Sequence, residues 1–145
     1  MAKVVTKVFI LIIAVLPIPN SSHILSDYNI MKSFKTIPDY PNYAINKNGE
    51  VFNKRLQIIM KSRFDTYGYK RINLSKHNEK KTYYLHQLVA KTYLPNENNY
   101  PCVDHINAIR DDNRLENLRW CSWVQNHWFR FWPNISKAST NDTNN

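Results

Sequence analysis

The feature that most constrains the fold is where the chain's only two glycines lie. Gly49 and Gly68 each end a short polar segment between stretches rich in apolar and aromatic residues. The first segment, residues 46–49, closes with Asn-Gly, a strong hairpin-turn signal because both residues tolerate positive φ. A third polar segment at residues 77–80 predicts another turn. The first half of the chain is therefore expected to be built from short antiparallel strands.

These turns divide the segment that follows Phe34 into a series of expected strands. The series ends at Leu85, where the spacing of the apolar residues changes. From Leu85 to Thr92 the apolar positions recur at i, i+3, i+4 and i+7, the spacing of one helical face, and Pro95 closes the segment. We therefore expect a helix over residues 85–93 that packs under the sheet. The expected strands are residues 43–45, 51–52, 58–64, 69–74 and 82–84.

The second half predicts a strand, a loop, a strand and a helix. Residues 102–106 and 115–120 are the expected strands. Ser122 followed three residues later by Gln125 is a capping-box pattern that predicts a helix from Trp123 to about Phe131. The predicted fold class is α+β, a small antiparallel β-sheet region followed by this ββα unit. We expect the four tryptophans to pack inside the unit; they are Trp120, Trp123, Trp128 and Trp132.

The positive charge is concentrated in one region. The chain has 20 Lys and Arg against 11 Asp and Glu, a formal charge of +9. Nine of the cations, opposed only by Asp65 and Glu79, lie in residues 54–81, where aromatic residues are interleaved with them. This pattern favours nucleic-acid contact over a merely solvated surface. The nine are Lys54, Arg55, Lys61, Arg63, Lys70, Arg71, Lys76, Lys80 and Lys81.

The two cysteines exclude a structural zinc centre of the usual kind. Cys102 and Cys121 form no Cys-x-x-Cys pair, and such a site needs four ligands. A disulfide between them would require an oxidising compartment, so buried thiols are the default expectation.

Both ends of the chain are expected to lie outside the folded core. Lys3 and Lys7 precede an apolar run, residues 8–16, that resembles a secretory signal but is too short to span a bilayer comfortably. Because Met31 is a plausible alternative start, we expect residues 1–30 to be a leader or upstream extension. A true signal peptide is the alternative. Residues 133–145 are rich in Ser, Thr and Asn, have little to bury, and are expected to be disordered.

Polar residues of the ββα unit suit phosphodiester chemistry. Asp104 and Asn126 offer a carboxylate and an amide oxygen, ligands suited to Mg²⁺ or Mn²⁺. His105 offers an imidazole that is neutral near pH 7 and can take a proton from attacking water. Together with a basic surface, they make a workable site for hydrolysis of nucleic acid.

The same residues resemble a known family. Residues 103–107 (VDHIN), residues 113–120 (NRLENLRW) and Asn126 closely resemble the ββα-metal motif of HNH homing endonucleases of the phage and viral type, in which Asn replaces the last His. Residues 84–90 resemble the segment that precedes this motif. Residues 38–53 look like the small DNA-binding module often found at the N-terminus of such proteins.

The resemblance implies a role for each motif residue. His105 would be the general base, and Asp104 and Asn126 would hold one Mg²⁺ or Mn²⁺ ion per site. Asn117 would support catalysis by holding the His105 segment and its ring orientation. Residues 34–81 would be a β-rich DNA-binding module, and residues 82–132 the nuclease motif with its preceding helix. The chain departs from the usual pattern at Asn107-Ala108, where relatives carry Asp-Gly, which puts the turn geometry in question.

The implied partner is double-stranded DNA, touched by the nine cations of residues 54–81 and by Arg110 and Arg114 near the cut. We expect a monomer without a small-molecule cofactor or stable membrane association, acting in the cytoplasm or nucleus of a host cell. Two alternatives stay open: a non-catalytic DNA-binding protein derived from an HNH nuclease, and a secreted nonspecific nuclease. Cleavage with divalent metal would exclude the first, and the mature N-terminus would decide the second.

Overall fold

A computed structural model of the chain describes residues 32–131. The predictions for the leader, residues 1–30, and for the tail, residues 133–145, lie outside the described residues. The chain divides into two units between Ser33 and Phe34, and all the strands and helices described below belong to the second unit. No helix among residues 32–131 has the length and apolar character needed to cross a membrane.

The first sheet contains four antiparallel strands in sequence order. They are β1 (Lys35–Ile37), β2 (Tyr40–Ile45), β3 (Val51–Asn53) and β4 (Ile58–Met60). The predicted turn at residues 46–49 joins β2 to β3, with Gly49 at φ +83° and its N–H donating to the carbonyl of Asn46 over 3.1 Å. The sequence patterns did not predict β1, a short strand paired with β2.

The second sheet contains three antiparallel strands: β5 (Arg63–Phe64), β6 (Lys70–Lys76) and β7 (Glu79–Tyr84). The expected single strand over residues 58–64 was therefore wrong. The chain breaks at residues 61–62, so that β4 pairs with β3 of the first sheet while β5 pairs with β6 of the second. Each short segment gains ladder hydrogen bonds with a different partner, which strand propensity alone does not reveal.

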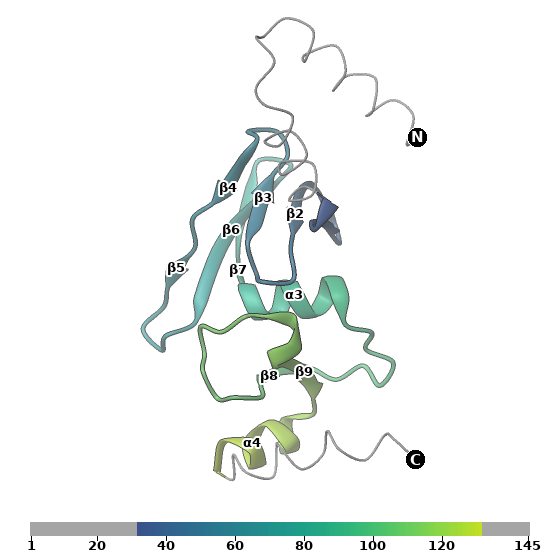
Figure 1. The fold of residues 1–145 in the computed structure, drawn as a ribbon, viewed down its shortest axis with the longest axis vertical. Helices are drawn as coiled ribbons and strands as arrows, with labels where there is room; N and C mark the ends of the chain where they lie inside the picture. Colours follow the sequence, from purple (N-terminus) through teal and green to yellow (C-terminus); the bar gives the residue numbers. More distant parts are fainter. Residues whose placement is uncertain (1–31, 132–145) are drawn as a thin grey trace, which may run out of the picture. The chain divides into compact units, whose positions relative to one another are not determined.

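Helix α3 (Leu85–Tyr93) has the bounds that its periodicity predicts, and it joins the two halves of the unit. It contacts β1, β2, β6 and β7 on one side (Figure 1). On the other side it contacts β8 (Cys102–His105), the 3₁₀ turn η1 (Leu115–Asn117) and β9 (Leu118–Cys121). Leu85, Leu88 and Val89 are buried in one core with residues of the first two sheets and with Leu118 of β9. Residues 34–81 and the nuclease-like segment therefore share a core.

The ββα unit has the expected order, but its second strand begins at Leu118 rather than at residue 115. Strand β8 (Cys102–His105) pairs with β9 (Leu118–Cys121), and a 3₁₀ turn, η1 (Leu115–Asn117), precedes β9. Helix α4 (Trp123–Phe131) follows. The capping box is present, since Gln125 N–H donates to Ser122 Oγ over 3.2 Å and Ser122 N–H donates to Gln125 Oε1 over 2.8 Å. The α+β class is confirmed.

The expectation that the tryptophans pack was wrong for Trp123 and Trp128, which are 70% and 51% exposed. Among residues 32–131, helix α4 buries none of its residues, and β8 is the element that it contacts most. Trp120 is half-buried and donates to the carbonyl of Leu94, and Trp132 lies outside the described residues. Cys102 and Cys121 are directly opposite each other on β8 and β9 as buried free thiols.

Candidate active site

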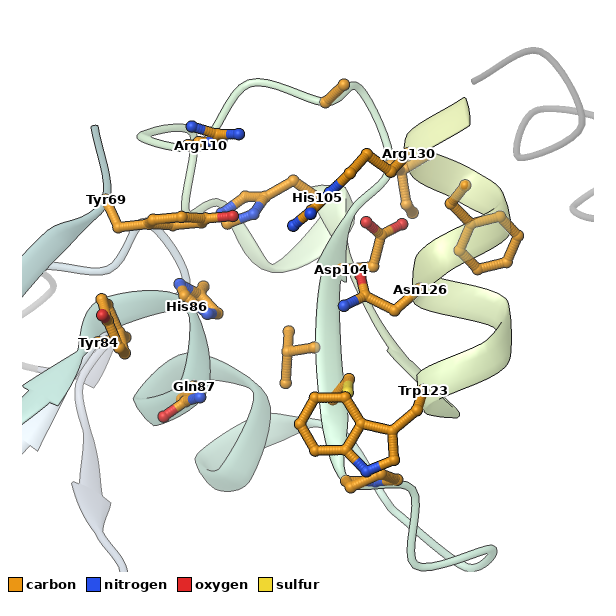
Figure 2. Close-up of a pocket in the computed structure, with 16 residues that line it drawn as sticks. Tyr69, Tyr84, His86, Gln87, Asp104, His105, Arg110, Trp123, Asn126 and Arg130 are labelled. Carbon is orange, nitrogen blue, oxygen red and sulfur yellow. The ribbon is translucent and has the colours of Figure 1, made fainter. Parts of the chain in front are cut away.

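A pocket of about 460 Å³ lies where β8 faces α4. Three of the four predicted site residues line it: Asp104 and His105 from β8 and Asn126 from α4. Figure 2 shows the side chains of Asp104 and Asn126 in the space between β8 and α4. The structure therefore brings together the expected base and both expected metal ligands.

His105 is 7% exposed, and its Nε2 lies 3.2 Å from Oδ1 of Asn113. Burial lowers the pKa of His105 below its ordinary value of 6.5, although the Asn113 contact and the nearby Asp104, Asp112 and Asp111 carboxylates act in the opposite direction. The imidazole is therefore neutral near pH 7. A neutral imidazole in a pocket has the protonation state of a general base.

A second buried histidine lines the same pocket. The ring of His86, in the first turn of α3, lies edge-on to the ring of His105 with 4.9 Å between centroids. Burial, and then the proximity of His105, lower the pKa of His86 to about 3, so this ring is also neutral. Tyr69 and Tyr84 pack against it. His86 is 6% exposed.

Asp104 is held by a cation from the opposite strand. Arg119 is its register partner on β9, and Arg119 Nε and Nη2 donate to Asp104 Oδ2 over 3.0 and 2.7 Å. The guanidinium also lies 3.5 Å from the ring centroid of Phe129 on α4. Both hydrogen bonds use Oδ2, and among the described residues Oδ1 of Asp104 accepts none, so this oxygen is open to a further ligand.

The oxygen donors in the pocket fit a hard divalent cation that has only a few protein ligands. Asp104 and Asn126 supply a carboxylate and an amide oxygen, and an ion such as Mg²⁺ commonly keeps several waters and takes substrate phosphate oxygens as further ligands. Within residues 32–131 no group of three or more His, Cys, Asp or Glu could hold a metal by itself. A two-ligand site therefore needs the substrate to complete its coordination.

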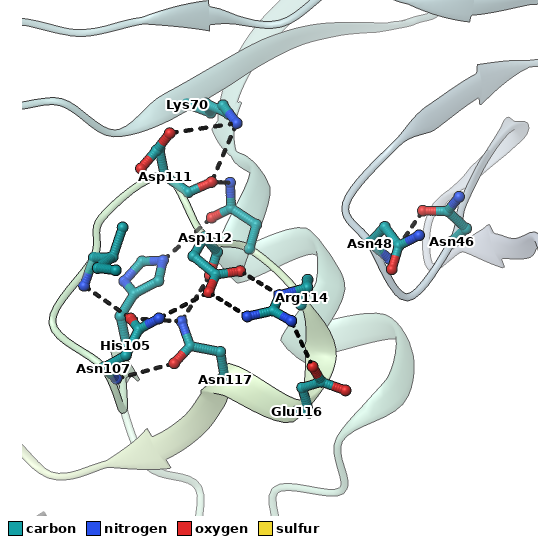
Figure 3. A network of polar contacts seen from close by, with 12 residues as sticks. Asn46, Asn48, Lys70, His105, Asn107, Asp111, Asp112, Arg114, Glu116 and Asn117 are labelled. Atoms are coloured by element: carbon teal, nitrogen blue, oxygen red, sulfur yellow. Dashed lines mark hydrogen bonds and ion pairs between the residues drawn. The ribbon is translucent and has the colours of Figure 1, made fainter.

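Asn117 lies outside the pocket lining and holds the loop behind it. Its Oδ1 accepts from the backbone N–H of Asn107 over 2.9 Å, and its backbone carbonyl accepts from Ile106 over 2.9 Å (Figure 3). Its Nδ2 donates to Oδ1 of Asn107 and to the backbone carbonyl of Asp112. Asn117 thus fixes the backbone that follows His105, while Oδ1 of Asn113 is the hydrogen-bond partner of the His105 ring.

The predicted DNA-contacting cations do not form one surface. Register places Arg63, Arg71 and Lys80 on the face of the second sheet opposite the buried Ile72 and Leu74. Arg55 and Lys61 are exposed in the segments flanking β4, whereas Lys54 donates to Thr36 Oγ1. Lys76 and Lys81 are exposed on the alternate positions of β6 and β7, and Lys70 contacts Asp111.

The two loop arginines differ. Arg110 lines the pocket, donates to the carbonyl of Tyr67 over 2.8 Å and lies over the Tyr69 ring. Arg114 lies outside the pocket lining and pairs with the carboxylates of Asp112 and Glu116 at 2.8 and 2.9 Å. The hydrogen bond from Arg114 lowers the pKa of Asp112, so the charge of Arg114 is used in ion pairs within the loop. Arg110 is the better placed of the two to meet a phosphate.

Comparison with known proteins agrees with this geometry. Residues 83–127 match the family model of the HNH endonucleases. These residues form an HNH endonuclease domain. Its matched segment includes α3, β8, η1, β9 and the first half of α4, and therefore all four predicted site residues.

Relatives of the HNH domain come from viruses and phages. An uncharacterized HNH endonuclease of Acanthamoeba polyphaga mimivirus is 44% identical over 85 residues, 59% of this chain and 26% of that protein. The DNA endonuclease I-HmuI of Bacillus phage SP01 is 33% identical over 109 residues, 72% of this chain and 63% of that protein. The chain thus spans about a quarter of the first relative and less than two thirds of the second.

A solved structure shares the fold. The structure of the HNH homing endonuclease I-HmuI, solved to describe its DNA binding and cleavage, superposes on this chain with a TM-score of 0.61 at 33% sequence identity. The match covers 74% of this chain and 64% of that chain, so it extends beyond the HNH domain.

Sequence reasoning missed two residues that touch the site residues. Arg119 faces Asp104 across the hairpin, but only in the register that the structure shows. Asn113 lies in the NRLENLRW segment, but no spacing rule marks a loop asparagine as the partner of a histidine eight residues earlier.

Proposed function

We propose that this chain is a divalent-metal-dependent DNA endonuclease of the homing-endonuclease type, which hydrolyses phosphodiester bonds. One observation carries the proposal: a single pocket holds a neutral imidazole, His105, beside the carboxylate of Asp104 and the amide of Asn126. The HNH domain match and the endonuclease relatives support the same reaction.

Each residue has a role in this proposal. His105 takes the proton of the attacking water. Asp104 and Asn126 hold one Mg²⁺ or Mn²⁺ ion, and Asn117 keeps the loop after His105 in place through the backbone of Ile106 and Asn107. When bound, the cation would supply Lewis-acid stabilisation of the charge that develops on the phosphate and leaving oxygen.

The electrostatics of the pocket suit a polyanion. Arg110 and Arg130 line it together with a single carboxylate, that of Asp104, which is already paired with Arg119. A phosphate entering this pocket meets a net positive charge from Arg110 and Arg130. Its oxygens would serve as further ligands of a cation held by Asp104 and Asn126. We propose double-stranded DNA as the substrate, with the chain acting as a monomer.

Metal removal tests the proposed reaction. Purified protein with Mg²⁺ or Mn²⁺ is expected to convert supercoiled plasmid to nicked or linear DNA, and excess EDTA is expected to stop cleavage completely. The measurement is one agarose gel, on which the three forms separate. Protein that binds plasmid DNA but leaves it supercoiled with every divalent cation tried would favour the non-catalytic alternative.

The outer face of the second sheet is expected to contribute to DNA affinity. Arg63 and Lys80 are both exposed on it, and Arg63 also donates to Asn73 Oδ1 over 3.0 Å. Replacing both with glutamine should weaken binding to all sequences alike. The slope of log K against log salt should shrink by about 0.9 for each phosphate that the variant no longer neutralises.

The matched control for this pair is Lys91→Gln, which removes a cation from the exposed side of α3. Fluorescence anisotropy of labelled duplex at several salt concentrations gives the slopes. An unchanged slope in the Arg63/Lys80 variant would remove this face from the interface.

A further inference from the structure

The side chain that fixes the ring of His105 is Asn113. It is 3% exposed, in the loop before η1, and its Oδ1 lies 3.2 Å from His105 Nε2. Its Nδ2 donates to the backbone carbonyl of Asp111 over 3.2 Å, and this bond sets which end of the amide faces the ring. Because an amide oxygen only accepts, Nε2 of His105 must carry the proton. The lone pair that takes a proton from water is then on Nδ1.

Asn113 is itself held by the turn between β2 and β3. A Cβ at Gly49 would lie 3.1 Å from Cβ of Asn113 and 3.6 Å from its carbonyl oxygen, so the turn backbone packs directly on this residue. Two residues later in the loop, Leu115 N–H donates to the carbonyl of Lys47 over 2.8 Å. The turn therefore braces the loop backbone at and just after Asn113.

The turn is rigid enough to act as a support. Asn46 Oδ1 accepts from the backbone N–H groups of Asn48 and Glu50 over 3.0 and 2.9 Å, and Asn46 Nδ2 donates to the Glu50 carboxylate over 2.6 Å. Asn46 and Asn48 are seen at the turn in Figure 3. The Asn46 side chain that makes these bonds is 6% exposed.

We propose that Asn113 is a positioning residue for His105, and that the β2–β3 turn holds Asn113 in the position that selects the Nε2-protonated form of the ring. This inference rests on the proposed function for its catalytic consequence. Residues 34–81 would then have a second role besides DNA contact, because the β2–β3 turn packs on Asn113, the hydrogen-bond partner of His105. Strands β3 to β7, helix α3 and strand β8 lie between the turn and Asn113 in the sequence, so only the fold brings the two together.

The protonation form of His105 can be measured directly. In full-length protein labelled with ¹⁵N-histidine, long-range ¹H–¹⁵N NMR spectra separate protonated from unprotonated ring nitrogens, and His105→Gln assigns the signals. We expect His105 of the wild type to be protonated at Nε2 alone. Asn113→Ala should give a mixture of both forms, whereas Asn113→Asp, which keeps an acceptor for Nε2, should retain the wild-type form.

Cleavage kinetics give the second measurement. Asn113→Ala should lower kcat for plasmid nicking by about 10- to 100-fold, the usual range for loss of a supporting hydrogen bond, with the DNA dissociation constant unchanged. Asn113→Asp should recover most of this loss. Asn98→Ala, an exposed asparagine in the loop before β8, is the control for asparagine replacement.

Two glycine variants test the turn. Gly49→Ala and Gly68→Ala place alanine at nearly the same positive φ, +83° and +84°, but a Cβ at Gly68 meets nothing within 4 Å. Backbone strain is therefore matched, and only Gly49→Ala pushes on Asn113. We expect mixed His105 protonation and slower nicking in Gly49→Ala alone.

The outcomes separate the two proposals. If the wild type fails to cut DNA, the proposed function is lost, while the NMR spectra still show whether Asn113 orients His105. If Asn113→Ala keeps a single Nε2-protonated ring and the wild-type kcat, the positioning role is overturned. If Gly68→Ala matches Gly49→Ala in both measurements, the packing of the turn on Asn113 is not what holds the ring.

Discussion

Replacing His105 with alanine is expected to lower the rate of metal-dependent DNA cleavage by about 100- to 10,000-fold, the range that a positioned general base contributes. The ring is 7% exposed and kept neutral by burial, which lowers its pKa, so it accepts a proton from water near pH 7. DNA affinity should stay at the wild-type value, because the buried ring offers no charge to phosphates. Single-turnover nicking of plasmid and anisotropy of labelled duplex measure the two quantities.

His127→Ala is the matched control for this prediction. His127 neighbours Asn126 on α4, but its side chain is exposed, stacks on Phe131 and does not line the pocket. The control variant should cut at the wild-type rate. An equal loss of nicking rate in the two variants would show that the effect is not specific to His105. A wild-type nicking rate in His105→Ala would show that His105 takes no part in the reaction.

Local patterns predicted the elements whose causes are local. Helix α3 runs from Leu85 to Tyr93, as its apolar period indicates, because four positions of that face are buried. The start of α4 follows from the capping box of Ser122 and Gln125, which satisfies backbone donors within one turn. In these cases a few neighbouring residues contain the whole physical reason.

The strands show where local reasoning ends. Residues 58–64 read as one strand, yet β4 and β5 belong to different sheets. Which strand each half pairs with depends on the backbone that lies beside it in the folded state, and the sequence of residues 58–64 does not determine this. The turn at Ala108 is a related case, since the residue adopts φ +61° although it is not a glycine. Asn107 stabilises this conformation, because its backbone N–H donates to Asn117 Oδ1, its Nδ2 donates to the Asp112 carboxylate and its Oδ1 accepts from the backbone N–H of Ile109.

The candidate site divides in the same way. Motif spacing was enough to place Asp104, His105 and Asn126 around one pocket. The residues that orient them were not predictable, because Arg119 faces Asp104 only in one of several registers of the hairpin. A slip of one residue would put Leu118 or Trp120 opposite Asp104 instead. Asn113 depends on the path of an irregular loop and on a turn from another sheet.

The metal ligands give the second large effect, and Asn126 is the cleaner of the two to test. Asp104→Ala also disturbs the ion pair with Arg119, whereas within residues 32–131 the side chain of Asn126 makes no hydrogen bond that its replacement would break. Asn126→Ala should weaken Mn²⁺ binding by more than the about 10- to 100-fold that loss of an outer-shell partner costs. Cleavage at limiting metal should fall in parallel.

Asn126→Asp is the decisive companion, because it keeps an oxygen ligand of the same shape and adds a negative charge beside Asp104. Its Mn²⁺ affinity should equal or exceed that of the wild type, since a second carboxylate strengthens a hard-cation site. Glu97→Ala, which removes an exposed carboxylate from the loop before β8, should leave the affinity unchanged. Electron paramagnetic resonance of free Mn²⁺ during titration, in the presence of uncleavable duplex, measures all three. Equal affinity in wild type, Asn126→Ala and Asn126→Asp would mean that α4 contributes no ligand, and the ion would have to be sought elsewhere on the chain.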